Sequence, residues 1–357
     1  MIEVSDAARD TLSAFDAVID VRSPAEFAED HAPGAINLPV LNDEERAQVG
    51  TIYVQKSKFL ARRVGAALVS RNIADHLLGP LSDKPGGWRP LIYCWRGGQR
   101  STAMATVLSQ VGWRVGLLSG GYRTYRRRVT AALYDSAPVR NLVLLSGGTG
   151  SGKTALLALL AARGVQTLDL EALAAHRGSL FGGLGGGVQP SQKMFESRLL
   201  AALDGLDPTR PTVVEAESSR IGEVFLPPTL WNGMTAAPRI ELHVPAVARA
   251  RHVIQSCREI ADNPQALGDA IMRLPRHHSR EARTLWQDMA RGGQLEALAL
   301  ALIEAHYDPA YRRSAGEAGG AVLADITLPD LDEVSIARGA DAVAGLVADP
   351  AKAILTP

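Results

Sequence analysis

A glycine-rich loop between an apolar run and an Ala/Leu-rich segment constrains the fold of this chain more than any other feature. The loop reads Gly147-Gly148-Thr149-Gly150-Ser151-Gly152-Lys153-Thr154 and lies between residues 142–145 and 155–162. The pattern Gly-x4-Gly-Lys-Thr needs a strand before it and a helix after it, because its backbone N–H groups wrap a phosphate at the helix N-terminus. We therefore predict an α/β domain in which Lys153 reaches the terminal phosphate and the Thr154 hydroxyl binds magnesium.

Acidic residues follow two further strand-like runs. The run 212–214 leads into Glu215 and Glu217, and the run 165–168 leads into Asp169 and Glu171. Strands of an open parallel sheet bind ligands at their carboxyl ends, so we expect these four acids beside the phosphate loop, with Glu215 ordering magnesium. For each acid taken alone, a helix N-cap or a solvated loop position is the alternative.

A second loop contains one of the two cysteines. Cys94 ends the apolar run 91–93 and opens the stretch Cys94-Trp95-Arg96-Gly97-Gly98-Gln99-Arg100-Ser101, after which a helical pattern begins. Backbone N–H groups and the helix dipole at such a turn stabilise negative charge, and Arg96 and Arg100 are expected to add to that effect. We predict that the thiol pKa falls from about 8.5 towards roughly 3.5–7.5. Cys94 is therefore a catalytic candidate, cradled by Arg96, Gly97, Gly98 and Arg100.

The spacing Cys-x5-Arg-Ser occurs both in cysteine-dependent phosphatases and in rhodanese domains, and the surrounding residues favour the second family. Residues 20–27 (Asp-Val-Arg-Ser-Pro-Ala-Glu-Phe) and 31–39 (His-Ala-Pro-Gly-Ala-Ile-Asn-Leu-Pro) resemble the first hallmark of rhodanese domains. Residues 118–122 resemble their closing strand and turn, and Tyr93 replaces the His that usually precedes a phosphatase Cys. The N-terminal region is therefore similar to a rhodanese-type sulfur carrier.

A rhodanese-like region fused to a phosphate loop resembles bacterial tRNA 2-selenouridine synthases. The stretches 42–51, 169–179, 189–192, 195–196 and 307–311 carry further matches. The family motif Glu-Asp-Glu-Ser-Arg-x-Ile-Gly appears at 215–222 as Glu-Ala-Glu-Ser-Ser-Arg-Ile-Gly, so Ala216 replaces an acid and the Arg moves by one position. This departure makes Glu215 and Glu217 the stronger candidates for the acidic part of the site.

The resemblance implies a reaction and assigns the two loops to it. Sulfur on a wobble 2-thiouridine of tRNA would be replaced by selenium from selenophosphate, through a geranylated intermediate made from geranyl diphosphate. Cys94 would carry or transfer the selenium, and the loop 147–154 would hold a diphosphate. An enzyme that supplies selenophosphate is a candidate partner.

Two functions of other classes fit the same motifs. One is a small-molecule kinase or ATPase with a rhodanese regulatory module. The other is a non-catalytic adaptor that passes persulfide to a partner, against which the intact Lys153-Thr154 pair argues. The motif leaves open whether the phosphate loop holds geranyl diphosphate, ATP or both, and the sequence leaves open the choice of tRNA and the oligomeric state.

Charge is balanced over the whole chain, with 38 Lys and Arg against 38 Asp and Glu. RNA binding would therefore depend on local clusters of basic residues. The residues that we expect to contact tRNA are Arg123, Arg126, Arg127, Arg128, Arg276 and Arg280. Two cysteines, the second being Cys257, suit a reducing compartment rather than a disulfide scaffold. With no signal peptide and no apolar stretch near about 18 residues, we expect a cytoplasmic protein without a membrane partner.

The predicted fold class is α/β, with a rhodanese-like domain, a P-loop NTPase-like parallel sheet and a mostly helical C-terminal region. We place the rhodanese-like domain at 1–132, with a helical insertion at 44–78, and the P-loop core at 141–245. The helical region would span 246–357, be associated with the P-loop domain, and end in a helix near 340–347. The glycine run 182–187 follows no apolar strand, so a mobile loop is expected there rather than a second phosphate site.

Overall fold

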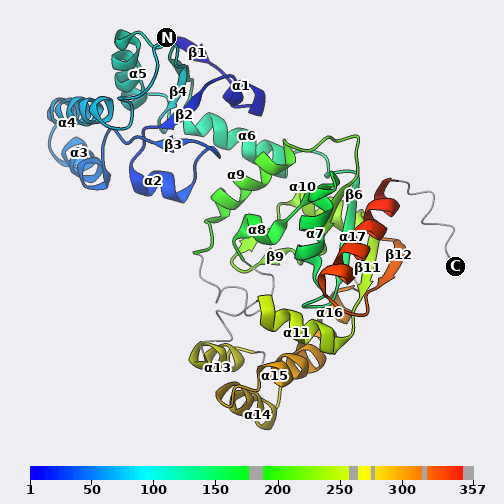
Figure 1. Cartoon of the computed structure of the whole chain (residues 1–357). Coiled ribbons are helices and arrows are strands. Elements are labelled where there is room, and N and C mark those ends of the chain that lie inside the picture. The colour runs from blue at the N-terminus through cyan, green and yellow to red at the C-terminus, as the bar shows by residue number, and fades with distance from the viewer. Residues whose placement is uncertain (177–187, 257–263, 275–277, 316–319, 349–357) are drawn as a thin grey trace. The chain divides into compact units, whose positions relative to one another are not determined.

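The computed structural model describes residues 1–176, 188–256, 264–274, 278–315 and 320–348, and the predicted glycine loop 182–187 lies outside them. The chain divides into two compact units (Figure 1). Unit 1 contains residues 1–135 and 193–204, and unit 2 contains residues 136–192 and 205–357. Each unit has a parallel sheet of five strands, which confirms the predicted α/β class.

The sheet of unit 1 has the strand order β1-β5-β4-β2-β3, and all its neighbouring strands are parallel. Its strands are β1 (Ile2–Val4), β2 (Ala17–Asp20), β3 (Ile36–Asn37), β4 (Pro90–Tyr93) and β5 (Gly116–Leu118). The central strand β4 is buried along its whole length, as expected of a parallel strand covered on both faces. Its carboxyl end therefore places Cys94 at the edge where parallel sheets bind ligands.

Seven helices of the described residues belong to unit 1. They are α1 (Arg9–Ser13), α2 (Pro24–Glu29), α3 (Asp43–Gln55), α4 (Lys58–Leu78), α5 (Gln99–Val111), α6 (Tyr122–Tyr134) and α9 (Gln192–Leu203). The core joins the sheet to α4 and α5 through residues such as Ile19, Ile92, Val69 and Met104. The predicted helical insertion is the hairpin of α3 and α4, which pack against each other.

Helix α9 belongs to unit 1 although β7 and β8 of unit 2 flank it in sequence. Partly buried polar contacts hold it there. Arg126 on α6 pairs with Glu196 on α9, the Tyr134 hydroxyl donates to Glu196 over 2.6 Å, and Arg128 donates to Asp204 over 2.6 Å. Glu196 is only 2% exposed, so this ion pair is largely protected from screening by water.

The sheet of unit 2 has the order β12-β11-β6-β8-β7, again with every neighbouring pair parallel. Its strands are β6 (Leu142–Gly147), β7 (Gln166–Leu168), β8 (Thr212–Glu215), β11 (Arg239–His243) and β12 (Val322–Thr327). A separate antiparallel pair joins β9 (Arg220–Ile221) to β10 (Val224–Phe225). Strand β12 completes the sheet from far along the chain, beyond a helical segment that follows β11.

The helices of unit 2 form two groups. Those around the sheet are α7 (Lys153–Ala162), α8 (Leu170–Ala174), α10 (Pro228–Ala236) and α17 (Glu333–Ala348). The others, between β11 and β12, are α11 (Ala246–Ser256), α13 (Pro264–Met272), α14 (Arg280–Arg291), α15 (Leu295–Leu302), the π-helix η1 (Ile303–Tyr307) and α16 (Asp308–Ala315). Helix α17 packs on α7 (Figure 1). Leu267, Trp286 and Leu298 form a second core among α13, α14 and α15. Among the described residues, no helix combines the length and apolar character needed to cross a membrane.

Candidate functional site

Backbone contacts shape the Cys94 loop at the carboxyl end of β4. The turn after β5 packs directly on it, since the Tyr122 N–H donates to the Cys94 carbonyl over 2.8 Å. Gly121 has φ +59°, and a Cβ there would lie 2.2 Å from the Cys94 carbonyl oxygen. Gly97, with φ +66°, has Gly120 N at 2.8 Å from the position of a Cβ. Side chains at these two glycines would therefore separate the two loops or strain the backbone.

The Cys94 sulfur receives hydrogen bonds from the start of α5. The Gly98 N–H lies 3.3 Å from Sγ and the Ser101 hydroxyl lies 3.1 Å from it. Burial raises the pKa of the Cys94 thiol, but the Ser101 hydroxyl and the backbone N–H groups of Ser101, Arg96 and Gly98 outweigh burial. The pKa of Cys94 is therefore lowered, in the predicted direction. Ser101 was not among the predicted site residues, although its hydroxyl has the largest lowering effect on the pKa of Cys94.

The two loop arginines act differently from the prediction. The exposed Arg96 contributes through its backbone N–H to the lowered pKa of Cys94. The Arg100 guanidinium lies 2.7 Å from the Glu26 carboxylate, which also lies 3.8 Å from Arg46. Burial raises the pKa of Glu26, yet the contact with Arg100 and its other partners lower it overall. The charge of Arg100 is therefore largely balanced by Glu26 rather than directed at the thiol.

Replacement of Ser101 by Ala is expected to raise the pKa of the Cys94 thiol, because the variant loses the hydroxyl that donates to Sγ over 3.1 Å and stabilises the thiolate. The measurement is thiolate absorbance against pH in a Cys257→Ser background, which leaves Cys94 as the single thiol. Ser109→Ala on the same helix is the matched control and should leave the titration unchanged. An identical midpoint in Ser101→Ala and its parent would contradict the role given to this hydroxyl.

Residues 20–27, the start of the first rhodanese-like hallmark, contribute a buried arginine that supports the Cys94 loop. The Arg22 guanidinium is 1% exposed, lies 2.6 Å from the Asp20 carboxylate and donates to the Asp30 carbonyl. It also stacks over the Tyr122 ring, with 4.0 Å between Cζ and the ring centroid, and Tyr122 in turn stacks on Trp95. The hallmark residues thus form a buried ion pair that holds the wall of the Cys94 loop.

In unit 2 the loop 147–152 joins β6 to α7 as the sequence predicts. Gly150 and Gly152 have φ of +78° and +80°, and a Cβ at Gly150 would lie 2.6 Å from Val253 Cγ2. The Lys153 ammonium donates to the Gly147 carbonyl over 3.0 Å and so curls back over the loop. The Thr154 hydroxyl lies 3.5 Å from Glu171 Oε2. The strand, the loop and the helix N-terminus therefore have the arrangement that a bound diphosphate needs.

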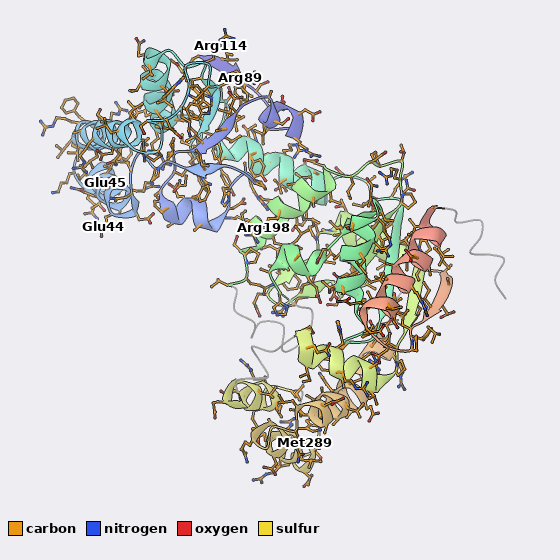
Figure 2. The ribbon with its side chains drawn as sticks, in the orientation of Figure 1. Glu44, Glu45, Arg89, Arg114, Arg198 and Met289 are labelled. Carbon is orange, nitrogen blue, oxygen red and sulfur yellow. The ribbon has the colours of Figure 1, made fainter. Side chains whose placement is uncertain are left out.

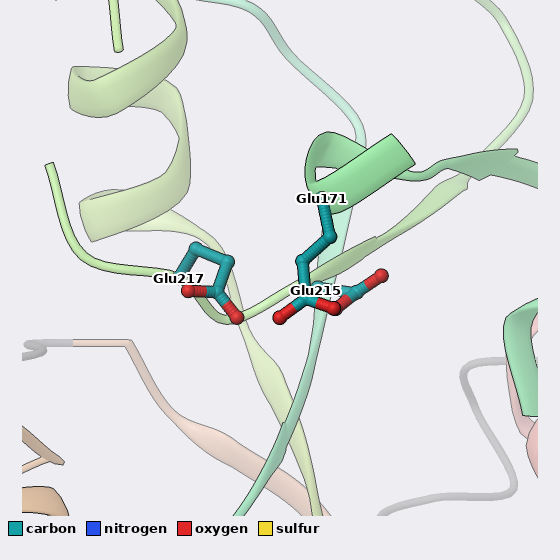
Figure 3. Close-up of side chains that lie close together, drawn as sticks. All are labelled: Glu171, Glu215 and Glu217. Carbon is teal, nitrogen blue, oxygen red and sulfur yellow. The ribbon is translucent and has the colours of Figure 1, made fainter. Parts of the chain in front are cut away.

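Three of the four predicted acids meet beside this loop (Figure 3). The carboxylate oxygens of Glu171, Glu215 and Glu217 include one from each residue within 4.8 Å of the others. Burial and the neighbouring carboxylates, Glu171 first among them, raise the pKa of Glu215 to about 9. Burial also raises the pKa of Glu217 to about 7, against the lowering effect of Lys153. Asp169 instead caps α8, since its Oδ1 accepts from Ala172 N–H over 2.8 Å.

The acidic cluster fits a hard divalent cation. Its donors are carboxylate oxygens, with a threonine hydroxyl close by, which is the chemistry that magnesium prefers. Glu215 is fully buried, and among the described residues neither of its carboxylate oxygens has a hydrogen-bond partner. Buried oxygens without partners cost free energy that a cation would recover. Glu171, Glu215 and Glu217 are therefore the residues that would hold magnesium.

A cavity of about 750 Å³ opens from the phosphate loop and the acids towards the helices that follow β11. At one end it is lined by Lys153, Thr154 and the three glutamates. The apolar residues of its lining include Val253, Ile254, Leu267, Leu295, Leu298, Ala299, Leu302 and Ile303, and His252, Ser256, Tyr307 and Tyr311 also line the cavity. The cavity therefore has a polar end suited to phosphates and an apolar end suited to a hydrocarbon chain.

Arg249 on α11 is a residue of this site that the sequence argument missed. Its guanidinium donates to the Thr149 carbonyl of the phosphate loop over 3.2 Å and to both oxygens of Asp308, over 2.8 and 2.7 Å. Asp308 lies in the predicted 307–311 stretch, whose Tyr307, Ala310 and Tyr311 line the cavity. No local sequence motif marks a buried arginine that bridges a loop and a helix. Of the two residues of this ion pair, only Asp308 lies in a stretch that was predicted from the sequence.

The arginines that we expected to contact tRNA differ in their exposure and in their ion pairing. Arg126 and Arg128 form ion pairs with Glu196 and Asp204, which reduces the positive charge they offer to a phosphate. Arg123 and Arg127 are exposed on α6, and Arg280 is exposed at the start of α14. Arg276 and Cys257 lie outside the described residues.

Comparison with known proteins finds two family descriptions that divide the chain. Residues 4–128 match the rhodanese-like domain, and residues 140–266 match the tRNA 2-selenouridine synthase AAA domain. The chain is similar to a tRNA 2-selenouridine synthase of Nitrosomonas europaea, with 37% identity over 67% of this chain and 62% of the relative. Similar proteins of the same name occur in Bdellovibrio bacteriovorus, with 35% identity over 66% and 63%, and in Nitrosomonas eutropha, with 33% identity over 79% and 70%. The chain thus spans less than two thirds of the length of the first two relatives.

Proposed function

The chain belongs to the tRNA 2-selenouridine synthase family, and from this membership we propose that it is a transferase that replaces the sulfur of a wobble 2-thiouridine in tRNA with selenium. Selenophosphate would be the selenium donor. We further propose that the exchange passes through a geranylated thiouridine made from geranyl diphosphate. We assign geranyl transfer to the phosphate-loop site of unit 2 and selenium transfer to the Cys94 site of unit 1.

The cavity of unit 2 is the observation that carries the geranyl diphosphate proposal. A prenyl diphosphate has a compact anionic head and a hydrocarbon tail. The head suits the loop 147–152 with Lys153, and the tail suits the wall formed by residues such as Val253, Leu295 and Leu302. The adenosine of ATP would instead place hydroxyl groups and ring nitrogens against these aliphatic side chains, at a cost in unpaired polar groups. This lining supports a prenyl diphosphate over a nucleotide.

The residues of this site are suited to the loss of a diphosphate. In prenyl transfer the thiocarbonyl sulfur bonds to the first prenyl carbon, and the carbon–oxygen bond breaks so that diphosphate leaves with the electron pair. The N3 proton of the base is released to solvent, so the geranylated base is neutral. Lys153 and the N–H groups of the phosphate loop would stabilise the charge that develops on the leaving oxygen. A magnesium ion held by Glu171, Glu215 and Glu217 would supply further neutralisation of that charge.

The Cys94 site of unit 1 would serve the second half of the reaction. Geranylation converts the sulfur of thiouridine into a thiolate leaving group, so selenium can replace it at the same carbon. Burial raises the pKa of Cys94, but Ser101 and the backbone N–H groups at the start of α5 lower it overall, and this increases the thiolate fraction at a given pH. We propose that Cys94 transfers the selenium in this step, with Gly97 and Gly98 shaping the loop around it. The Cys94 thiolate would bond to the phosphorus of selenophosphate, the phosphorus–selenium bond would break, and the released selenide would bond to the base carbon as geranyl thiolate leaves with the electron pair. Water would then cleave the sulfur–phosphorus bond at Cys94 and release phosphate.

Replacement of Leu295 by Gln tests the apolar end of the cavity. We expect geranyl diphosphate to bind roughly tenfold or more weakly, because a buried leucine side chain contributes about 1.5–3 kcal/mol. Pyrophosphate, which has no tail, should bind as it does to the parent. Calorimetric titration with geranyl diphosphate, pyrophosphate and ATP separates the ligand classes.

The matched control for this test is Leu285→Gln, which changes a leucine that is 54% exposed on α14 and does not line the cavity. It should leave all three affinities unchanged. If Leu295→Gln weakens ATP binding and leaves geranyl diphosphate binding unaffected, the cavity holds a nucleotide. That result would support the kinase or ATPase alternative and contradict the prenyl diphosphate proposal.

A further inference from the structure

The hairpin of α3 and α4 carries an exposed surface with a strong positive charge. Residues 46–74 contain no Asp or Glu, although the chain as a whole is neutral. The basic residues of this segment are Arg46, Lys56, Lys58, Arg62, Arg63 and Arg71. Arg46 and Arg71 pair with Glu26 and Glu45. Lys56, Lys58, Arg62 and Arg63 are exposed, and within the part of the chain that the structure describes they form no ion pair with an acid.

Aromatic side chains lie among these cations at the turn of the hairpin. Phe59 is 75% exposed and Tyr53 is 46% exposed, and the Lys58 ammonium lies 5.8 Å from the centroid of the Tyr53 ring. Exposed apolar patches that polar residues surround mark interaction sites on protein surfaces. We define Tyr53, Lys56, Lys58, Phe59, Arg62 and Arg63 as the hairpin tip.

The core of unit 1 does not need these side chains. Helix α4 buries Ala61, Gly65, Val69 and Ile73, which are spaced four residues apart and form one face of the helix. A Cβ at Gly65 would lie 3.4 Å from Val49 of α3, so this face is already occupied by the neighbouring helix. At 100° per residue, Phe59 and Arg63 project from the opposite face. Their exposure therefore leaves a surface that the fold itself does not use.

We propose that the hairpin tip binds an unpaired loop of tRNA, with Tyr53 and Phe59 stacking on bases and the four cations contacting phosphates. Aromatic platforms interleaved with Lys and Arg are the chemistry that recognises single-stranded nucleic acid. This inference rests on the proposed function, since it assigns a surface to the tRNA substrate. An anionic membrane is the less suitable partner, because the apolar face of α4 is buried and leaves no amphipathic helix to insert.

The tip is also within reach of the Cys94 loop. Arg46 shares Glu26 with Arg100, which lies in the first turn of α5, directly after the Cys94 loop. From Arg46 to Tyr53 the rise along α3 is about 10 Å, at about 1.5 Å per residue. One RNA loop can therefore lie on the tip and present a neighbouring base to Cys94.

The test measures the affinity of the full-length chain for a tRNA anticodon stem-loop and for a duplex RNA of equal length. Phe59→Ala should weaken binding of the stem-loop by roughly tenfold and leave the duplex nearly unaffected, because only unstacked bases use the aromatic platform. The double variant with Lys56→Glu and Lys58→Glu should bind both the stem-loop and the duplex RNA more weakly. It should also make the log–log salt dependence shallower by about 0.7–0.9 for each phosphate that the protein no longer neutralises.

Arg114→Glu is the matched control, since Arg114 is exposed on the opposite side of unit 1 from the start of α3, where Glu44 and Glu45 lie (Figure 2). It should leave RNA affinity almost unchanged. Geranyl diphosphate affinity and thiolate absorbance of Cys94 report the folding of units 2 and 1 in every variant. Vesicles containing phosphatidylserine are the second probe for the same proteins.

The outcomes separate the two proposals. If the parent protein binds neither RNA, the proposed function fails and this inference fails with it. If the parent binds the stem-loop and the tip variants bind it equally well, the function stands and the tip assignment is wrong. Loss of vesicle binding in the tip variants, with RNA binding intact, would assign the surface to a membrane and also overturn the inference.

Discussion

Geranyl diphosphate is expected to bind about 10- to 100-fold more weakly to Lys153→Ala than to the parent protein. A hydrogen bond from a charged donor contributes roughly 1.5–3 kcal/mol, and each 1.4 kcal/mol is about tenfold in affinity. The Lys153 ammonium already lies 3.0 Å from the Gly147 carbonyl, at the mouth of the phosphate loop, so little rearrangement is needed for it to contact a diphosphate. Neither geranylated nor selenated nucleoside should form, since the first step supplies the substrate of the second.

Two further variants test whether the loss of affinity comes from the positive charge at position 153. Lys153→Arg keeps the positive charge and should lose less affinity than Lys153→Ala. Arg163→Ala removes a cation at the other end of the same helix, where Arg163 donates to Asp341 over 2.7 Å, and should bind geranyl diphosphate normally. Calorimetric titration gives the affinities and chromatography of digested tRNA gives the products. Equal affinity of Lys153→Ala and the parent for geranyl diphosphate, pyrophosphate and ATP would remove the basis for assigning this loop to a diphosphate.

Cys94→Ala should have the opposite product pattern. Prenyl transfer uses the diphosphate site and has no requirement for a thiolate, so geranylated thiouridine should accumulate. Selenouridine should fall on the order of 1000-fold or more, as expected when a reacting thiol is removed. The readout is again the nucleoside composition of tRNA treated with geranyl diphosphate and selenophosphate.

Cys257→Ala is the matched control, because it removes the other cysteine of the chain. It should form both products at the parental rate. Full selenium incorporation by Cys94→Ala would show that the thiol is dispensable. Loss of geranylation in Cys94→Ala, with parental geranyl diphosphate affinity, would show that the two steps are not separable as proposed.

Local patterns were sufficient to locate both loops. A phosphate loop is defined by neighbours in sequence, since the glycines, Lys153 and the apolar strand before them act within a dozen residues. The same holds for Cys94, which is placed by the end of β4 and the start of α5. The meeting of Glu171, Glu215 and Glu217 was also predictable, because β7 and β8 are parallel neighbours and their carboxyl ends share one edge of the sheet.

What the sequence determined by itself, then, is the set of elements whose chemistry is local: two parallel-sheet domains, two loops and the acids at strand ends. Tertiary structure decided which arginines remain available to bind a phosphate or a thiolate and which are paired with an acid. Arg100 is paired with Glu26, Arg126 with Glu196 and Arg249 with Asp308, across separations of 59–74 residues that no motif spans. It also placed α9 in unit 1 and brought the helices after β11 over the phosphate loop. The physical reason is that burial and ion pairing depend on which distant surfaces meet, whereas a loop that binds an anion depends only on its own backbone.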